Sequence, residues 1–319
     1  MALPKIFDKL QLPVIAAPMF ILSNKAMVIE QCKAGIVGSF PALNARGEGE
    51  FESWLQIISE ELDRYNQANP DQPAAPFAVN QIVFKSNTRL HEDMELCVKY
   101  KVPIIITSLG ANEEINSAAH SYGGIVMHDV INQRFARKAI AKGADGLITV
   151  AAGAGGHAGA LSPFALVQET REWFDGPLAL SGCIATGASV LAAQAMGADF
   201  GYIGSAFIAS KEANADQAYK QMVVDSDADD IVYSDYFTGV SGNYLKPSIE
   251  AAGLDPNNLP KGDIAAMQKL TNEQSDAKAW KDIWGCGQGI GAIDQIQNVA
   301  ERVAQLKKEY LVAKTKLTS

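Results

Sequence analysis

One histidine lies in a segment that is otherwise built of small residues. The segment from Ala151 to Gly159 reads AAGAGGHAG, and His157 is its only titratable side chain. Glycine and alanine leave the main chain uncovered, so a flat or anionic ligand could approach it closely. An imidazole, with an ordinary pKa of about 6.5, suits acid–base chemistry near neutral pH. We therefore expect a loop that faces a ligand and carries a proton-transfer group; the alternative is an ordinary hydrogen-bonded loop histidine.

Two other glycines follow consecutive apolar runs and could help to bind a phosphate. Gly182 comes after Ser181 at the end of one run, and Gly204 precedes Ser205 at the end of the next. Glycine lets the backbone approach an anion, while serine hydroxyls and backbone amides donate to phosphate oxygens. Each glycine alone could form no more than a tight turn. Their occurrence after two consecutive runs favours a phosphate site.

Small, soft or polar side chains end several of the other runs. They are Ala17, Pro18, Met19, Asn80, Gln81, Thr107, Ser108 and His128. Met19 offers a polarizable surface suited to the face of an aromatic ring, although methionine is also a common core residue. His128 could contact a cofactor or substrate, or it could simply precede a helix capped by Asp129. Together these side chains fit a flat ring system with polar edges and a phosphate tail.

The histidines and cysteines form no metal-binding pattern. The four histidines lie in separate segments, and the four cysteines are scattered without a CxxC pair. We therefore expect no metal site. Scattered cysteines are also typical of a reducing compartment. Cys183 lies beside Gly182, where a small apolar filling role is favoured over catalysis.

Eight apolar runs rich in Val, Ile and Ala are predicted to be strands. They are Val14–Met19, Gly35–Phe40, Phe77–Ile82, Pro103–Leu109, Gly124–Val130, Gly146–Ala152, Pro177–Cys183 and Phe200–Ile208. Their continuous rather than alternating hydrophobicity is typical of parallel strands buried on both faces. Helices are predicted between them, around Asn24–Ala34, Glu50–Tyr65, Thr88–Lys101, Glu113–Tyr122, Gln133–Lys142, Pro163–Phe174 and Ser189–Met196. Several of these helices end at a glycine, which is usual C-cap chemistry: Gly123, Gly143 and Gly197.

This succession predicts an α/β fold, a (β/α)8 TIM barrel with an insertion subdomain between strand eight and the last helix. A doubly wound open sheet is the competing architecture, but no GxGxxG follows the first strand. Because the carboxyl ends of barrel strands meet at one face, the segments described above would gather around one mouth.

The regular alternation stops after Ala209. We expect residues 1–209 to form the barrel, residues 210–289 an insertion over its mouth, and residues 290–319 a C-terminal helix that completes the barrel. That helix is predicted at about Ile293–Lys314. The insertion could serve as a lid over a cofactor, or form a small satellite core. Its aromatic and polar side chains include Tyr233, Tyr236, Phe237, Asn243, Tyr244 and Lys246.

Composition and charge narrow the class of protein. The chain has 319 residues, of which 48% are hydrophobic and 20% charged, and its formal net charge is −9. An acidic chain of this kind argues against nucleic acid or an anionic membrane surface as partner. We see no signal peptide and no run of about 20 apolar residues that could span a bilayer. We expect a cytoplasmic protein that binds a small molecule and could form a homo-oligomer.

The chain resembles the nitronate monooxygenase family, formerly called 2-nitropropane dioxygenases, across roughly residues 10–210. Four segments in a fixed order carry the resemblance: Ala17-Pro18-Met19, Gly155-Gly156-His157-Ala158-Gly159, Leu180-Ser181-Gly182 and Tyr202-Ile203-Gly204-Ser205. The resemblance implies a TIM-barrel monooxygenase that holds FMN without a covalent bond and oxidises nitronates, or nitroalkanes, with O2.

The resemblance also assigns roles to residues. It places the FMN phosphate on Gly182, Gly204 and Ser205, with Ser181 and Gly156 beside the cofactor. The flavin ring would lie near Ala17, Pro18, Met19 and Asn80, and Gly155 would pass close to it. His157 resembles the family's catalytic base, which removes the α-proton of a nitroalkane or orients a nitronate.

Two positions depart from the family's pattern. Val150 stands where the fungal-like members often have Gln, and His128 stands where some relatives have Lys. The same fold also houses NAD(P)H-dependent flavin reductases that act on quinones or enoyl thioesters. Such a reductase is the alternative function, and a barrel that only binds a phosphorylated ligand is a third.

Overall fold

The computed structural model describes residues 3–84, 86–262 and 282–318, and its centre is an eight-stranded parallel barrel. The strands are β1 (Val14–Ala16), β2 (Gly38–Pro41), β3 (Phe77–Ile82), β4 (Ile104–Ser108), β5 (Ile125–Val130), β6 (Gly146–Val150), β8 (Leu178–Ser181) and β9 (Phe200–Ile203). Their order around the sheet is β1-β9-β8-β6-β5-β4-β3-β2. The ring closes between β1 and β2, where Ala16 N–H donates to the Val37 carbonyl at 2.8 Å. The predicted (β/α)8 barrel is therefore confirmed, and the open-sheet alternative is wrong.

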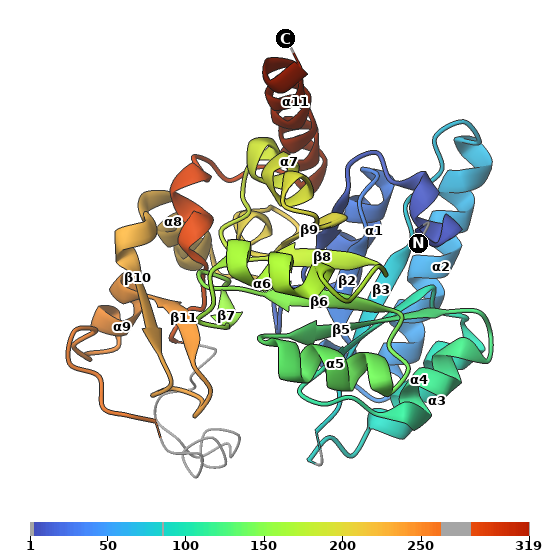
Figure 1. Ribbon diagram of the computed structural model, residues 1–319, viewed down its shortest axis with the longest axis horizontal. Coiled ribbons are helices and arrows are strands. Elements are labelled where there is room, and N and C mark those ends of the chain that lie inside the picture. Colours follow the sequence, from blue (N-terminus) through green and yellow to red (C-terminus); the bar gives the residue numbers. More distant parts are fainter. Residues whose placement is uncertain (1–2, 85, 263–281, 319) are drawn as a thin grey trace.

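Helices alternate with these strands, and Figure 1 shows them around the outside of the sheet. They are α1 (Lys25–Lys33), α2 (Glu50–Ala68), α3 (Leu90–Lys99), α4 (Glu113–His120), α5 (Gln133–Ala141), α6 (Pro163–Arg171), α7 (Gly187–Ala195) and α11 (Val299–Thr318). Several of these helices begin at an N-cap residue whose short polar side chain accepts a backbone hydrogen bond. Asn24 accepts from Met27 N–H, Asn132 accepts from Phe135 N–H, and Thr186 accepts from Ser189 N–H. The predicted glycine ends are present, because Gly123, Gly143 and Gly197 all have positive φ.

The C-terminal helix α11 packs closely against α7. Gly187 allows this approach, because a Cβ at that position would lie 2.0 Å from the Leu306 carbonyl oxygen. Tyr310 then donates its hydroxyl hydrogen to Gln194 Oε1 at 2.6 Å. In Figure 1 the outer end of α11 extends beyond α7. The helix occupies the place in the outer layer that the eighth barrel helix needs.

The strand side chains form two distinct layers of core. The interior of the barrel contains Ile15, Val37, Ala78, Ile104, Ile106, Met127, Ile148, Ala179 and Phe200. Phe7, from the short 3-10 helix η1 (Lys5–Lys9), packs against Phe200 with ring centroids 4.6 Å apart and closes the amino-terminal end. The alternate strand positions, such as Val79, Ile105 and Val126, pack against the helices. This alternation decides which residues near the carboxyl ends face the barrel axis.

Beyond β9 the chain forms further 3-10 turns and a small second sheet. These turns are η3 (Ser205–Phe207), η4 (Ala228–Asp230) and η5 (Gln288–Ala292), whereas the turn η2 (Ala42–Asn44) directly follows β2. The helices are α8 (Gln217–Asp225) and α9 (Lys246–Ala251), and the new strands are β10 (Ile231–Ser234) and β11 (Gly242–Leu245). These strands pair antiparallel, and β11 also pairs with β7 (Gly156–His157). Figure 1 shows this sheet beside the barrel. The division into residues 1–209, 210–289 and 290–319 stays a prediction, and residues 263–281 of the insertion lie outside the described part.

Seven of the eight predicted strands begin later or end earlier than expected, among them the runs that lead into the loops after β1 and β9. The run predicted as Phe200–Ile208 is a strand only to Ile203, and Ser205–Phe207 turns into η3. The run predicted as Val14–Met19 ends at Ala16, just before Pro18, which has no N–H to continue a ladder. In both places the chain leaves the barrel at the mouth.

Candidate functional site

The carboxyl ends of the strands place a layer of mostly small or polar side chains above the apolar interior. Side chains two positions apart in a strand point to the same face, so the residues two positions after the interior ones also face the barrel axis. They are Asn80, Ser108, Asp129, Val150, Ser181 and Tyr202. Val150 and Tyr202 are partly buried against the interior cluster, as this spacing requires. Asn80 and Ser181 were predicted from the sequence, whereas Asp129 was considered only as a helix cap. The layer forms the floor of the barrel mouth, where active sites of this fold lie.

Three of these side chains form a hydrogen-bonded chain across β3, β4 and β5. Asn80 Nδ2 donates to Ser108 Oγ at 2.8 Å, and the Ser108 hydroxyl donates to Asp129 Oδ2 at 2.5 Å. Burial raises the pKa of Asp129 to about 6, although the bonds from Ser108 and the Leu109 backbone favour its charged form. Burial, and then the charge of Asp129, also raise the pKa of Tyr202 well above its usual range. The floor thus carries a carboxyl group that changes charge near neutral pH.

His128 does not belong to this floor. Val126 and Val130 lie on the same face of β5 as His128, and both belong to the core between the strands and the helices. Its Nδ1 lies 2.6 Å from the Thr107 hydroxyl, and burial lowers its pKa to about 4. Asp129 takes the interior place for which the sequence suggested His128. The role of His128 in holding a cofactor stays a prediction that none of these contacts supports.

The glycine-containing loops meet at the mouth. A Cβ at Gly155 would lie 3.0 Å from Ser205 Oγ, and one at Gly204 would lie 3.4 Å from the Cβ of Ala17 and 3.8 Å from Met19 Sδ. Gly182 has a φ of +134°, and a Cβ there would lie 2.8 Å from the Ala152 carbonyl oxygen. The loops that follow β1, β6, β8 and β9 are therefore in contact with one another. The absence of a Cβ at Gly155 and Gly182 is what allows these loops to approach one another so closely.

His157 lies on the short strand β7, where the sequence predicts a loop. It pairs with Gly242 of β11, and its Nε2 lies 2.9 Å from the hydroxyl of Thr238. Burial lowers the pKa of His157 to about 4, so its ring is neutral near pH 7. A neutral imidazole holds one unprotonated nitrogen and can accept a proton.

The chain beyond β9 is hydrogen-bonded at several points to residues 151–159, the histidine segment that carries His157. The bonds run from Gln288 N–H to Gly153 O (2.9 Å), from Asn243 Nδ2 to Ala154 O (2.7 Å), from Ala158 N–H to Ser241 O (3.1 Å) and from Tyr233 OH to Ala158 O (2.9 Å). Of the aromatic residues predicted to be important here, Phe237 and Tyr244 form a satellite core with Ile249 and Ile283, against which Tyr236 packs. Lys246 instead donates to the Asp229 carbonyl at 2.6 Å. The satellite core, one of the two alternatives, is present, and Tyr233 and Asn243 bond the histidine segment.

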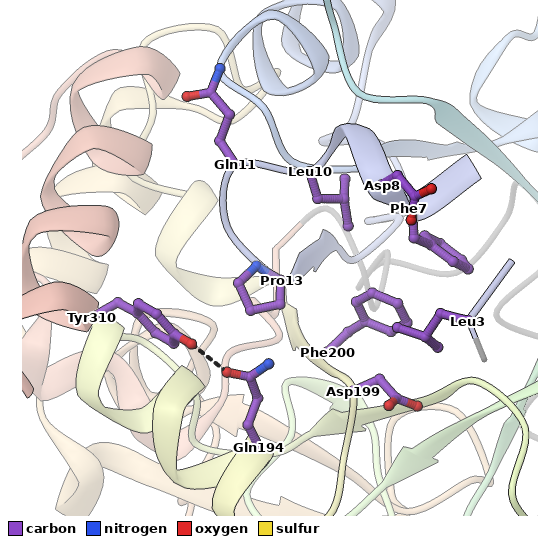
Figure 2. A pocket seen from close by; sticks show the side chains of 10 residues that line it. All are labelled: Leu3, Phe7, Asp8, Leu10, Gln11, Pro13, Gln194, Asp199, Phe200 and Tyr310. Carbon is purple, nitrogen blue, oxygen red and sulfur yellow. Dashed lines mark hydrogen bonds between the residues drawn. The ribbon is translucent and has the colours of Figure 1, made fainter. Parts of the chain in front are cut away.

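Two hollows lie at opposite ends of the barrel. One of about 320 Å3, shown in Figure 2, is bordered by Pro13 and Asp199, which directly precede β1 and β9. It lies at the amino-terminal face, which in this fold serves stability rather than catalysis. The other, of about 270 Å3, is bordered by Ile82, Phe84 and Leu109 at the mouth. Its lining is mixed, because Ser86, Asn87, Thr88 and Arg89 also border it.

Among residues 3–84, 86–262 and 282–318, no three His, Cys, Asp or Glu side chains come together as metal ligands. No helix in that part of the chain is long and apolar enough to cross a membrane.

Solved structures share this fold over the whole chain. The structure described as nitroalkane oxidase from Streptomyces ansochromogenes has a TM-score of 0.78 at 20% identity and covers 98% of this chain and 100% of its own. FabK from Thermotoga maritima has a TM-score of 0.77 at 21% identity and covers 100% and 99%. At these identities the similarity concerns the fold.

Proteins of similar sequence and a family model identify the family of this chain. A nitronate monooxygenase of Paraburkholderia phytofirmans is 25% identical over 93% of this chain and 92% of its own length. A nitronate monooxygenase of Neurospora crassa is 26% identical over 93% and 88%. The family model described as nitronate monooxygenase matches residues 5–309, nearly the whole chain. The chain therefore belongs to the nitronate monooxygenase family, whose members are flavin-dependent oxidoreductases that act on a small molecule with O2.

Proposed function

We propose that this protein is a nitronate monooxygenase that uses FMN and O2 to oxidise alkyl nitronates, and nitroalkanes after proton removal. One observation carries the proposal. The loops that follow β1, β6, β8 and β9 meet at the barrel mouth with Gly155, Gly182 and Gly204 at their contacts, and the same β6 loop carries His157. A phosphorylated flat ring and a proton-accepting side chain would thus meet in one place.

The residues at the mouth fit FMN. Ser205 Oγ accepts from Gly287 N–H at 2.9 Å and also bonds the buried Cys286 thiol, which stays protonated because burial raises its pKa to about 12. If that thiol donates to Oγ, the Ser205 hydrogen can be donated to a phosphate oxygen. Gly182 adopts a conformation that L side chains rarely adopt, which lets its backbone approach an anion. The phosphate would be held by Ser181, Gly182, Gly204 and Ser205, and the ring would lie against Ala17, Pro18, Met19, Asn80, Gly155 and Gly156. FMN, when bound, supplies the electron acceptor that O2 reoxidises.

His157 would act on the substrate as a neutral imidazole. With a nitroalkane, the α C–H bond breaks, the proton passes to the unprotonated ring nitrogen, and the electron pair spreads onto the nitro oxygens. With a preformed nitronate no proton has to leave carbon, and the ring would orient the anion.

The cysteines support the proposal of a cytoplasmic protein. All four are free thiols; Cys32, Cys97 and Cys286 are buried and Cys183 is exposed. Burial raises the pKa of Cys32 to about 12, so that thiol is unreactive. Free thiols of this kind persist in a reducing compartment.

The identity of the flavin and the substrate can be tested on the purified protein. We expect a yellow protein with an absorbance band near ~450 nm that releases FMN, rather than FAD or riboflavin, on denaturation. Turnover should be measured in parallel with ethyl nitronate, nitroethane, quinones and NAD(P)H. A colourless protein that does not take up added FMN would refute the proposal.

A reductase is the second candidate, because an enoyl reductase domain of MlnA from Bacillus amyloliquefaciens shares the fold with a TM-score of 0.69 at 17% identity. The two functions differ in the electron donor. Anaerobic mixing with NADH or NADPH would bleach the flavin of a reductase rapidly. A nitronate monooxygenase should be bleached by the nitronate instead.

A further inference from the structure

The hydroxyl group of Thr238 lies at the centre of a small hydrogen-bonded group beside His157. Thr238 is buried, and its Oγ1 lies 2.9 Å from His157 Nε2 and 3.0 Å from the Val240 carbonyl oxygen. Val240 N–H and the Tyr244 hydroxyl lie farther away, each at 3.4 Å. One hydroxyl group thus connects the imidazole to a turn of the insertion.

The chemistry of these partners decides where the hydrogen atoms lie. The Thr238 hydroxyl donates its single hydrogen to the Val240 carbonyl oxygen, which can only accept. The hydrogen in the bond between Thr238 and His157 must then come from Nε2. Because a neutral imidazole has only one N–H, the unprotonated nitrogen of His157 is Nδ1.

We propose that Thr238 is a positioning residue that holds His157 as its Nε2–H tautomer and so makes Nδ1 the proton-accepting atom. This inference rests on the proposed role of His157 as base. The bond also persists after proton transfer, because the imidazolium carries a hydrogen on both nitrogens. Thr238 would then accept a bond from a cation, which stabilises that state more than the neutral ring.

The surrounding backbone keeps Thr238 in place. Residues 238–242 form the turn that leads into β11, where Gly242 pairs with His157 itself. A Cβ at Gly242 would lie 2.7 Å from the Gly156 carbonyl oxygen, so the two strands approach each other closely. Phe237, the neighbour of Thr238, packs edge-on against Tyr244 with ring centroids 4.9 Å apart. The hydroxyl is therefore presented from a packed core.

The tautomer can be observed directly in the flavin-loaded protein. Labelling histidine with 15N and recording long-range 1H–15N correlations distinguishes a protonated Nε2 from a protonated Nδ1. The chain has only four histidines, and the spectrum of His157→Asn identifies the signals of His157. We expect the wild-type ring to carry its hydrogen on Nε2, and Thr238→Val to give a mixture or the other tautomer. Thr238→Ser should restore the wild-type pattern.

Kinetics supply the second readout. Thr238→Val keeps the shape of the side chain but loses the bond, so we expect kcat with nitroethane to fall about 10- to 100-fold with little change in KM. The loss with preformed ethyl nitronate should be much smaller, since no proton leaves carbon. Thr315→Val removes the same hydroxyl from the exposed part of α11 and should leave both rates unchanged.

The possible outcomes separate the inference from the proposed function. If Thr238→Val keeps both the Nε2–H tautomer and the wild-type kcat with nitroethane, Thr238 does not position His157 and the inference is wrong. If His157→Asn retains full turnover, the role of His157 as base fails, and the positioning role fails with it whatever tautomer is observed. If Thr238→Val changes the tautomer and lowers kcat only where a proton must be removed, and Thr238→Ser restores both, the inference is supported.

Discussion

Replacing Asp129 by Asn should stabilise the protein at neutral pH and change little at pH 4. The folded state holds the pKa of Asp129 at about 6 against an ordinary value of 3.8, because the carboxyl is buried. Between these two pH values the folded chain binds more protons than the unfolded chain. Its free energy of unfolding therefore falls as pH rises through that window, and the cost is complete above about pH 6.

The magnitude follows from the size of the change in pKa. The rise from 3.8 to about 6 corresponds to about 3 kcal/mol of lost stability at pH 7.5. Asn removes this cost, but its one carbonyl oxygen must serve both Ser108 and the Leu109 amide, which offsets about 1 kcal/mol. The expected net gain at pH 7.5 is about 2 kcal/mol.

The assay is urea unfolding of flavin-free protein at several pH values between 4 and 8, with wild type and Asp129→Asn side by side. Asp175→Asn is the matched control, because it removes one carboxylate from an exposed position. A carboxyl 13C titration should also give a pKa near 6 that disappears in Asp129→Asn. The reasoning is refuted if Asp129→Asn is less stable than wild type at pH 7.5, or if the difference between them does not depend on pH.

Three further results are expected from the loops at the mouth. Since the pKa of His157 is about 4, kcat/KM for nitroethane should stay flat from pH 8 to 6 and fall only below about pH 5; a midpoint near the ordinary value of 6.5 would contradict this. Gly182→Ala should weaken FMN binding at least 10-fold in a fluorescence titration, because its φ is +134° and the new Cβ would lie 2.8 Å from a carbonyl oxygen. Gly253→Ala is the control, since it also has positive φ but open space around it. Asn243→Ala should leave the Ala154 carbonyl without its 2.7 Å bond, cost about 1–3 kcal/mol, and speed hydrogen exchange in the histidine segment; unchanged exchange would count against the role given to Asn243.

The barrel could be predicted from the sequence because its signals are local. The strand predicted at Phe77–Ile82 has those same bounds, since an apolar run bounded by polar segments defines its own ends. Helix starts at Asn24 and Asn132, and helix ends at glycines, likewise depend on neighbours within a few residues. The small residues of the mouth were recognisable because each follows a strand. Their roles toward a cofactor remain predictions.

Two features of the site could not be obtained in the same way. The strand β7 has only two residues, and it exists because β11 lies beside it; nothing within its own neighbourhood specifies that pairing. The choice between His128 and Asp129 depends on which strand positions face the barrel interior, and the sequence leaves this open because Ile125, Val126 and Met127 are all hydrophobic. Met127 lies in the barrel interior, so Asp129 and not His128 shares its face of β5; this orientation depends on contacts with the other strands of the barrel.

The pairing of β7 with β11 has a consequence for the order in which the protein matures. His157 and its partner Thr238 are separated by 81 positions in the chain. During synthesis all eight barrel strands leave the ribosome before the segment that fixes the histidine does. A nascent or truncated chain that ends near residue 210 would expose the glycine-lined mouth without an anchored imidazole. If His157 acts as the proposed base, catalysis requires a segment whose strands β10 and β11 lie outside the barrel sheet.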